Sequence, residues 1–595
     1  MAAAIEAKEI VKGGSFLIEQ QTPESIFTPG DFNEEHRMIA DTTRQFMDAE
    51  VLPRIAQLES KDWNLARELV KKAAELGLVG ANIPEEYGGL GLDQTSGAII
   101  AENIGRSASF ATTLGAQSGI GLLPILYFGT EAAKQKYLPP IAAGDLITAY
   151  ALTEASSGSD AMAAKATAKL SEDGKEYILN GEKMFITNGG FADIFVVFAK
   201  VDGDKFSAFI VERQEGCKNG AEEHKMGIKG SSTTPLILAD ARTPVENLLG
   251  DIGKGHKIAF NILNIGRFKL GAMCLGGMKL AMHESVRYAN ERQQFGKSIS
   301  SFGAIKAKLG EMAIRTWVGE AMIYRTLGMI EEGLGAVADS KDYDARLKAI
   351  EEYAAECSII KVALSEYCDY VTDEMVQIFG GYGYSADYPA ERAYRDTRIN
   401  RIFEGTNEIN RMLIPGRLMK AALSGRLALL PAAQALMDEI LSPSMASFDL
   451  DEGLLATEQK LAQNAKKVAL MTLGTAAQKY MMGLSDQQEI LMSVANIIMD
   501  TFAMESAILR TQKMAAAQSE QAVMQYAEMT RVFCNDAVER IEAEAKNTLA
   551  AMAEGDELRT LLAALRRFTK MTPMNTVAAR QKIANAMIEA NRYVY

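Results

Sequence analysis

The segment Arg401–Ile409, which reads RIFEGTNEI, places a carboxylate between an aromatic residue and a glycine. A carboxylate enclosed by apolar groups has a raised pKa and can act as a general base near neutral pH. Taken alone, Glu404 would more often be a surface residue ahead of a helix. The neighbouring segments must therefore decide whether Glu404 is catalytic.

Three further segments could each serve a ligand or be ordinary local structure. Gln377–Tyr384, QIFGGYGY, interrupts a helical pattern with glycines, as a close ligand or a plain helix end would require. Tyr150–Asp160, YALTEASSGSD, gathers hydroxyls around a glycine, and Lys183–Gly190, KMFITNGG, reads as a strand ending in a turn. None of the three is decisive by itself.

Periodicity divides the chain into helical and β-rich parts. Apolar residues follow helical spacing from residue 33 to about 150, from 262 to about 422, and again from 427 to 595. Between them, β-rich runs occupy 176–179, 184–187, 193–198, 206–211 and 236–238. Asn180-Gly181 predicts a tight turn between the first two of these runs.

Together, the four segments resemble the acyl-CoA dehydrogenase family in composition, order and separation, over about residues 30–420. Four more stretches and the helical extension after residue 420 resemble its very-long-chain branch. These stretches are Thr113–Ala116, Asp193–Phe195, Lys225–Lys229 and Asn264–Phe268.

The resemblance implies a mainly α fold with a central β-domain. We expect an N-terminal helical domain at 1–150, a middle β-domain at 151–262, a four-helix FAD and catalytic domain at 263–422, and a C-terminal helical extension at 423–595.

The resemblance also implies an enzyme of fatty acid β-oxidation. Such an FAD enzyme removes two hydrogens from a long-chain acyl-CoA, forms the trans-2-enoyl-CoA, and passes electrons to an electron-transferring flavoprotein. We expect a homodimer or a dimer of dimers. Some relatives carry the base on a helix of the third domain, where this chain has Gly266, so the resemblance assigns catalysis to Glu404.

The other site residues are carried over from the family motifs. The expected FAD-binding residues are Tyr150, Leu152, Thr153, Gly158, Ser159, Phe185, Ile186, Thr187, Arg292, Phe295, Gln377, Gly380, Gly381, Thr406 and Glu408. The expected substrate-binding residues are Ser159, Asn264, Arg267, Phe403 and Gly405. Relatives usually have Trp where this chain has Phe185, and often Gln near Gly303, which therefore receives no role.

Small residues near the expected active site predict a deep acyl pocket. Ala111, Gly115, Ala116 and Gly119 lie in the segment that forms the pocket floor in long-chain relatives. Small side chains leave room for methylenes, although close helix packing also favours them.

Three rival functions share the fold. An acyl-CoA oxidase would pass electrons to oxygen, and an assembly or scaffold flavoprotein would keep the fold without turnover. A nucleic-acid-binding relative is disfavoured by the net charge of -14 and by the lack of a basic C-terminal stretch.

Composition adds expectations about compartment and metals. Five scattered cysteines indicate free thiols, and four histidines without ligand spacing predict no metal site. Residues 1–20 resemble neither a signal nor a transit peptide. We expect a cytoplasmic protein of bacterial type, or a matrix protein if a presequence was removed. We also expect the C-terminal extension to complete the dimer. Its segment Leu461–Leu484 has two interpretations, either the core of a helical bundle or an apolar face beside Lys466 and Lys467 that makes peripheral membrane contact.

Overall fold

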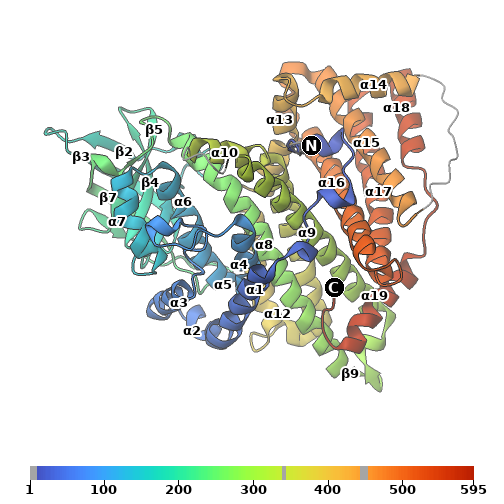
Figure 1. Cartoon of the computed structure of the whole chain (residues 1–595), viewed down its shortest axis with the longest axis horizontal. Helices are drawn as coiled ribbons and strands as arrows, with labels where there is room; N and C mark the ends of the chain where they lie inside the picture. The colour runs from blue at the N-terminus through green and yellow to red at the C-terminus, as the bar shows by residue number, and fades with distance from the viewer. Residues whose placement is uncertain (1–9, 338–342, 442–452) are drawn as a thin grey trace, which may run out of the picture.

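The chain forms three groups of elements arranged in a row. The structure is a computed structural model that describes residues 10–337, 343–441 and 453–595. The strands of the β-domain lie at one end, long helices occupy the middle, and the C-terminal helices lie at the other end (Figure 1). A separate two-stranded sheet, β9 Gln293–Gln294 and β10 Lys297–Ser298, follows the first long middle helix. The predicted fold class, mainly helical with a central β-domain and a C-terminal helical extension, is confirmed.

In the described part of the chain, which starts at residue 10, seven α-helices precede the sheet, and polar residues cap several of them. Asn33 accepts the N–H of His36 and Asp62 accepts the N–H of Leu65, which satisfies backbone donors that a helix start leaves unpaired. The helices are α1 Glu34–Phe46, α2 Ile55–Glu59, α3 Trp63–Glu75, α4 Gln94–Ile104, α5 Ala108–Gly115, α6 Leu123–Phe128 and α7 Glu131–Ala142.

The β-domain is one sheet in the order β6-β7-β3-β2-β4-β5-β8, with β1 paired in parallel to β4. The strands are β1 Thr148–Ala151, β2 Thr167–Leu170, β3 Glu176–Thr187, β4 Ile194–Val201, β5 Lys205–Glu212, β6 Cys217–Asn219, β7 Thr233–Pro244 and β8 Leu248–Leu249. The boundary expected at residue 150 falls inside β1. Tyr150 therefore lies in this first strand of the sheet, which follows α7.

The tight turn predicted at Asn180-Gly181 is wrong. Strand β3 runs straight through both residues, and its pairing with β7 shifts register between Leu179 and Gly181. Gly181 has φ 143, and a Cβ there would lie 2.8 Å from the Cα of Ala166. The glycine therefore forms a bulge where another backbone segment approaches closely, a second role of Asn-Gly that local sequence cannot separate from a turn.

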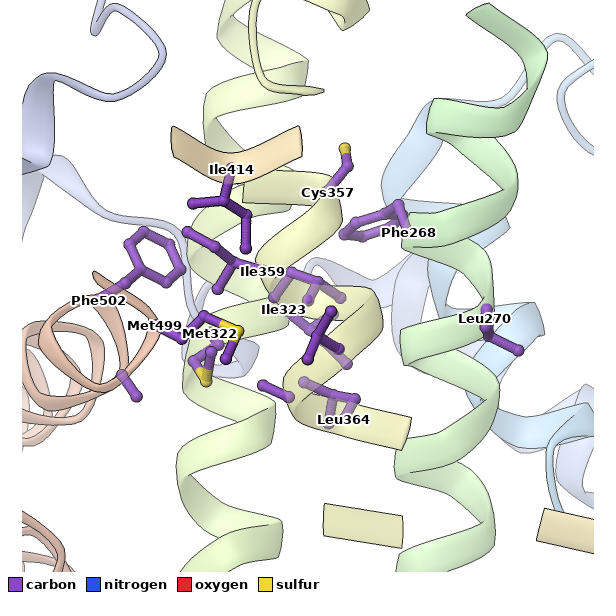
Figure 2. Close-up of a cluster of buried hydrophobic side chains, with 14 of the residues drawn as sticks. Phe268, Leu270, Met322, Ile323, Cys357, Ile359, Leu364, Ile414, Met499 and Phe502 are labelled. Carbon is purple, nitrogen blue, oxygen red and sulfur yellow. The ribbon is translucent and has the colours of Figure 1, made fainter. Parts of the chain in front are cut away.

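Six helices form the middle of the molecule and enclose its largest core. They are α8 Gly255–Glu291, α9 Gly303–Gly335, α10 Tyr343–Glu351, α11 Ala354–Phe379, α12 Pro389–Thr397 and α13 Asn407–Leu423. Figure 2 shows Phe268 of α8, Ile323 of α9, Ile359 of α11, Ile414 of α13 and Phe502 of the C-terminal region converging in this core. Helix α8 begins at Gly255, ahead of the boundary expected at residue 263.

The C-terminal helices form a bundle beside α9. They are α14 Leu429–Leu441, α15 Ala456–Tyr480, α16 Gln488–Ala517, α17 Met524–Met552, α18 Gly555–Phe568 and α19 Thr576–Ala590. Of these, α16, α17 and α19 pack on α9, and buried ion pairs join α16 to α9. Arg325 of α9 bonds to Glu505 at 2.6 Å, and Arg510 bonds to Glu320 at 2.5 Å. The extension is therefore an integral part of the fold in a single chain.

The apolar residues of α15 lie in the helical core, as the bundle interpretation of Leu461–Leu484 predicts. Lys466 is buried and pairs with Glu505, and Lys467 pairs with Glu439 at 2.8 Å, so neither lysine is free for lipid. Two described helices, α8 and α16, are long and apolar enough to cross a membrane. Their apolar windows are 67% and 72% buried inside the protein, as in core helices.

Candidate active site

Glu404 lies in a short loop between a 3-10 turn at Arg398–Arg401 and α13. It has φ 59, and Gly405 follows at φ 82. The left-handed conformation costs a residue with a side chain about 1–3 kcal/mol and is free for glycine. The Thr406 hydroxyl accepts the N–H of Ile409 at 3.2 Å and begins α13. The backbone of the candidate base Glu404 is therefore in a strained, left-handed conformation.

The carboxylate of Glu404 faces Gly266 across the interior. Its Oε2 is buried and has no hydrogen-bond partner among the described residues. A Cβ at position 266 would lie 2.6 Å from this oxygen, so glycine provides the space that the carboxylate occupies. Burial raises the pKa of Glu404 to about 7, although the positive charges of Arg267 and Lys361 act in the opposite direction.

Two buried cations hold the backbone around Glu404. Lys361 Nζ donates to the carbonyl of Gly405 and to Oδ1 of Asn407, each at 2.7 Å. Arg267 Nε donates to the carbonyl of Glu404 at 3.3 Å, and its Nη1 donates to Oδ1 of Asn264 at 2.9 Å. Asn264 and Arg267, expected to contact substrate, lie behind the loop and are absent from the wall of the cavity in front of it.

The backbone N–H of Glu404 is available to a ligand. Within residues 10–337, 343–441 and 453–595, no acceptor takes this N–H. A free amide beside a carboxylate can donate to a carbonyl oxygen while the carboxylate meets the neighbouring carbon. The loop therefore offers a donor and a base side by side.

A cavity of about 190 Å³ extends from Glu404 into the helical region. Helix α8 lines it from Ile262 to Glu284, and α5, α11 and α12 complete the wall. Phe403 lines it beside Glu404. The four small residues predicted for the pocket floor also line this cavity, namely Ala111, Gly115, Ala116 and Gly119.

The β-domain contributes polar groups near the cavity. The hydroxyl of Tyr150 is buried without a partner, and the charge of Glu404 contributes, after burial, to raising the pKa of this phenol. Met184 donates to the carbonyl of Thr153 at 2.9 Å, and Lys183 donates to that of Leu152 at 3.2 Å. These bonds tie the segment after β1 to β3, whose last residue, Thr187, lines the cavity.

Not all expected cofactor residues lie together. Ile186 is buried in the sheet, whereas Phe185 has φ 58 and is 58% exposed. Gly158 and Ser159 lie on an exposed turn between β1 and β2, outside the cavity. Glu408 is exposed at the start of α13, on the outer side of the loop that carries Glu404.

A second hollow of about 1050 Å³ lies where α8 and α11 end, and shares no lining residue with the cavity of Glu404. Its wall includes Arg292, Gly380 and Gly381, and Arg292 stacks over Tyr382 at 5.3 Å. Gln377 is exposed on α11 just before the glycines. Phe295, 90% exposed at φ 54, follows Arg292 in the next loop.

The residues present fit the expected FAD. A flavin nucleotide has a flat ring with a polar edge and an anionic pyrophosphate. Phe185 and Phe295 expose aromatic faces, which suits contact with another molecule. Tyr150 leaves a buried hydroxyl unpaired, and nothing lies within 4 Å of a Cβ placed at Gly380 or Gly381, so a ligand can approach this backbone closely. Arg292 suits a phosphate.

Sequence reasoning missed three charged groups near the site, the buried Lys361 and Asp396 and the half-buried Lys269. Burial lowers the pKa of Lys361 to about 8 and raises that of Asp396 to about 7. Lys269 lines the cavity three residues after Gly266. Helical spacing from Gly266 could have found Lys269, whereas Lys361 and Asp396 are brought in from other helices. Among the described residues, no group of three His, Cys, Asp or Glu side chains could hold a metal ion.

Models of acyl-CoA dehydrogenase domains match most of the chain. The N-terminal domain matches residues 33–145, the middle domain matches 149–241, and the C-terminal domain matches 253–419. A further model, also described as an acyl-CoA dehydrogenase C-terminal domain, matches residues 464–567 in the helical extension.

Individual relatives agree with these matches. A probable acyl-CoA dehydrogenase of Bacillus subtilis is 51% identical over 99% of this chain and 100% of its own length. The crystal structure of an acyl-CoA dehydrogenase complexed with FAD from Bacillus anthracis has a TM-score of 0.96 at 50% identity, covering 98% of this chain and 100% of that one. The mitochondrial very long-chain specific acyl-CoA dehydrogenase of Rattus norvegicus is 42% identical over 57% of this chain and 51% of its own length.

Proposed function

The chain belongs to the acyl-CoA dehydrogenase family of FAD-dependent oxidoreductases, and on that premise we propose that it oxidises long-chain fatty acyl-CoA to trans-2-enoyl-CoA. Electrons then pass to an electron-transferring flavoprotein. The observation that carries the proposal is the unpaired carboxylate of Glu404 at the head of a long cavity.

The dimensions of the cavity support a long acyl chain. Its lining runs along α8 from Gly266 to Glu284, a rise of about 27 Å at 1.5 Å per residue. An extended chain advances about 1.2 Å per bond, so this length corresponds to roughly 20 bonds. The volume of 190 Å³ holds about 13–19 water-sized groups at 10–15 Å³ each, which is the tighter limit. Both values favour chains of about palmitoyl length over butyryl.

The protein's part in the reaction is proton removal at the α-carbon. The N–H of Glu404 would donate to the thioester carbonyl and stabilise negative charge that develops there. An unprotonated Glu404 Oε2 would take the α-proton. A pKa of about 7 suits this role, because the base is then about half ionised at neutral pH and its ionised form binds a proton more strongly than an ordinary carboxylate does. The buried cations Lys361 and Arg267 hold the strained loop in this geometry.

We propose that the β-domain and the glycine-rich hollow hold FAD. Tyr150, Thr153, Thr187 and Phe185 would border the flavin ring, and Gly380 with Gly381 would accommodate the nucleotide end. When bound, FAD supplies the two-electron acceptor for the hydride that leaves the β-carbon. Walls of apolar side chains exclude water from the reacting carbons.

The active unit in this proposal is at least a dimer. Phe295 exposes an aromatic ring almost completely, and Arg292 lies beside it at the rim of the hollow. Exposed aromatic and guanidinium groups are typical of contact surfaces. Both residues would contact FAD of a second subunit.

An anaerobic titration with acyl-CoAs of increasing length tests the proposal. Palmitoyl-CoA should bleach the flavin absorbance more efficiently than butyryl-CoA, and the Glu404→Gln variant should retain FAD without bleaching. Bleaching by no acyl-CoA would instead indicate a scaffold flavoprotein. Reoxidation by oxygen as fast as by electron-transferring flavoprotein would indicate an acyl-CoA oxidase.

A further inference from the structure

Lys269 is an amine without a partner in the wall of the acyl cavity. Among the described residues, none forms a hydrogen bond or an ion pair with its Nζ, although the side chain lines the same cavity as Glu404. Burial lowers the pKa of Lys269 to about 8, and no neighbouring charge offsets this effect. The side chain is half-buried, and an ammonium that faces a largely apolar cavity without a protein acceptor is the feature to explain.

The surroundings of Lys269 leave room for that partner. Two small cavities of about 20 Å³ each also border the side chain, and they contain few polar groups, such as Asn82 and Asn264. Each could hold one or two waters at 10–15 Å³ per water. The other charged groups lining the acyl cavity are Arg106, Glu284, Arg392, Asp396 and Glu404. None of them contributes to the pKa of Lys269.

Its place on α8 sets where a ligand would meet it. Lys269 lies three residues beyond Gly266, a rise of about 4.5 Å, and side chains at this spacing share a helix face. Gly266 lies against the carboxylate of Glu404, which would face the α-carbon of the substrate. The amine therefore borders the acyl chain a few carbons beyond the reacting pair, well before the far end of the cavity at Glu284.

From this arrangement we infer that Lys269 is a specificity-determining residue that selects acyl-CoAs carrying an acceptor oxygen on the acyl chain. The inference rests on the proposed function, because it takes the cavity to be the acyl site. The oxygen can be the terminal carboxylate of a dicarboxylic chain or a hydroxyl within a longer one. Either group would give the amine the hydrogen bond that the protein does not supply.

The test compares matched substrates on the FAD-loaded enzyme. Adipyl-, suberyl-, sebacyl- and dodecanedioyl-CoA are each measured against the monocarboxylic acyl-CoA of equal length. Palmitoyl-CoA with a mid-chain hydroxyl is measured against palmitoyl-CoA. We expect the kcat/KM ratio of oxygenated to plain substrate to peak at one intermediate length, or to rise with the hydroxyl, which distinguishes the two sources.

Variants assign the preference to the amine. Lys269→Met should lower the ratio about ten- to a hundredfold, the loss of one hydrogen bond to a charged group, and should improve plain substrates severalfold. Lys269→Arg should keep most of the preference. Leu270→Met, a neighbouring change of cavity shape without charge, should leave the ratio intact. An unchanged ratio in Lys269→Met would mean that water satisfies the amine and would overturn the inference.

A pH series on the unmodified protein gives a second readout. The protonated amine binds the acceptor, so the ratio should fall as pH rises from 7 to 9 through the pKa of about 8. A ratio constant over this range would contradict the inference even if the variants failed to fold. Activity with palmitoyl-CoA tests the proposed function separately, since it does not depend on an oxygen on the chain.

Discussion

Replacing Glu404 with Gln should abolish turnover while stabilising the folded chain at alkaline pH. The carboxylate has an ordinary pKa of 4.5 and a pKa of about 7 in the folded protein, chiefly through burial. Between these values the folded state binds more protons than the unfolded state. The stability of the native protein therefore falls as pH rises through this window, and Gln, which does not titrate, avoids that loss.

The size of the effect follows from the same two values. At 1.36 kcal/mol per pH unit, the difference between 4.5 and about 7 amounts to about 3 kcal/mol. Unfolding 595 residues carries about 2.1 cal/mol/K per residue, or roughly 1.2 kcal/mol/K in total. The Tm difference, Glu404→Gln minus native protein, should thus be about 2 °C larger at pH 8.5 than at pH 4.5.

The assay pairs thermal melts at the two pH values with single-turnover reduction by palmitoyl-CoA. Reduction should slow at least about a thousandfold, within the range that a general base contributes, while FAD content stays normal. Comparing the variant with the native protein at each pH cancels every group that both share. Near-normal reduction would remove Glu404 as the base. A Tm difference that does not change with pH would refute the argument from its burial.

Three further perturbations address other parts of the molecule. Arg292→Ala should release flavin and weaken association, and a fully active monomer in sedimentation would contradict this expectation. Gly115→Leu should shorten the cavity, because even a Cβ there comes within 2.7 Å of Met273 Cε, and should reduce kcat/KM for palmitoyl-CoA about fourfold per excluded methylene while sparing butyryl-CoA. Arg510→Met should leave Glu320 buried with a single cationic partner, Lys279, and lower the stability by about 3–5 kcal/mol in thermal melts. The double variant Arg510→Met with Glu320→Gln should recover part of this loss.

The family and the fold class could be read from the sequence because their signals are local or periodic. The segment Arg401–Ile409 carries the base, its glycine and the cap of α13 within nine residues, so no folding was needed to bring them together. Helical and β-rich parts followed from apolar spacing, which the pitch of a helix and the pleat of a strand impose directly. The small residues at positions 111–119 predicted a pocket floor through the family resemblance of their segment, and all four line the cavity.

The conformation of Asn180-Gly181 could not be predicted from the local sequence. Its dipeptide suits both a turn and a bulge, and the choice depended on Ala166, which approaches from the segment just before β2. In the sequence, Lys466 and Lys467 stand beside apolar residues and have no evident partner. In the structure, Glu505 and Glu439 from other helices form ion pairs with them. Each outcome rests on partners that are distant in sequence and that no periodic pattern identifies.

The chemistry of the site was also decided by tertiary structure. The sequence indicated a carboxylate at Glu404, but its pKa depends on walls contributed by several helices and on the cations Arg267 and Lys361. Gly266 read as a missing base, whereas the fold makes it the space that the carboxylate needs. Lys269 became a candidate only once α8 was seen to line the cavity with no acid beside it. Short-range patterns settle backbone conformation and family motifs, while burial and charge pairing depend on contacts that form only when remote segments pack together.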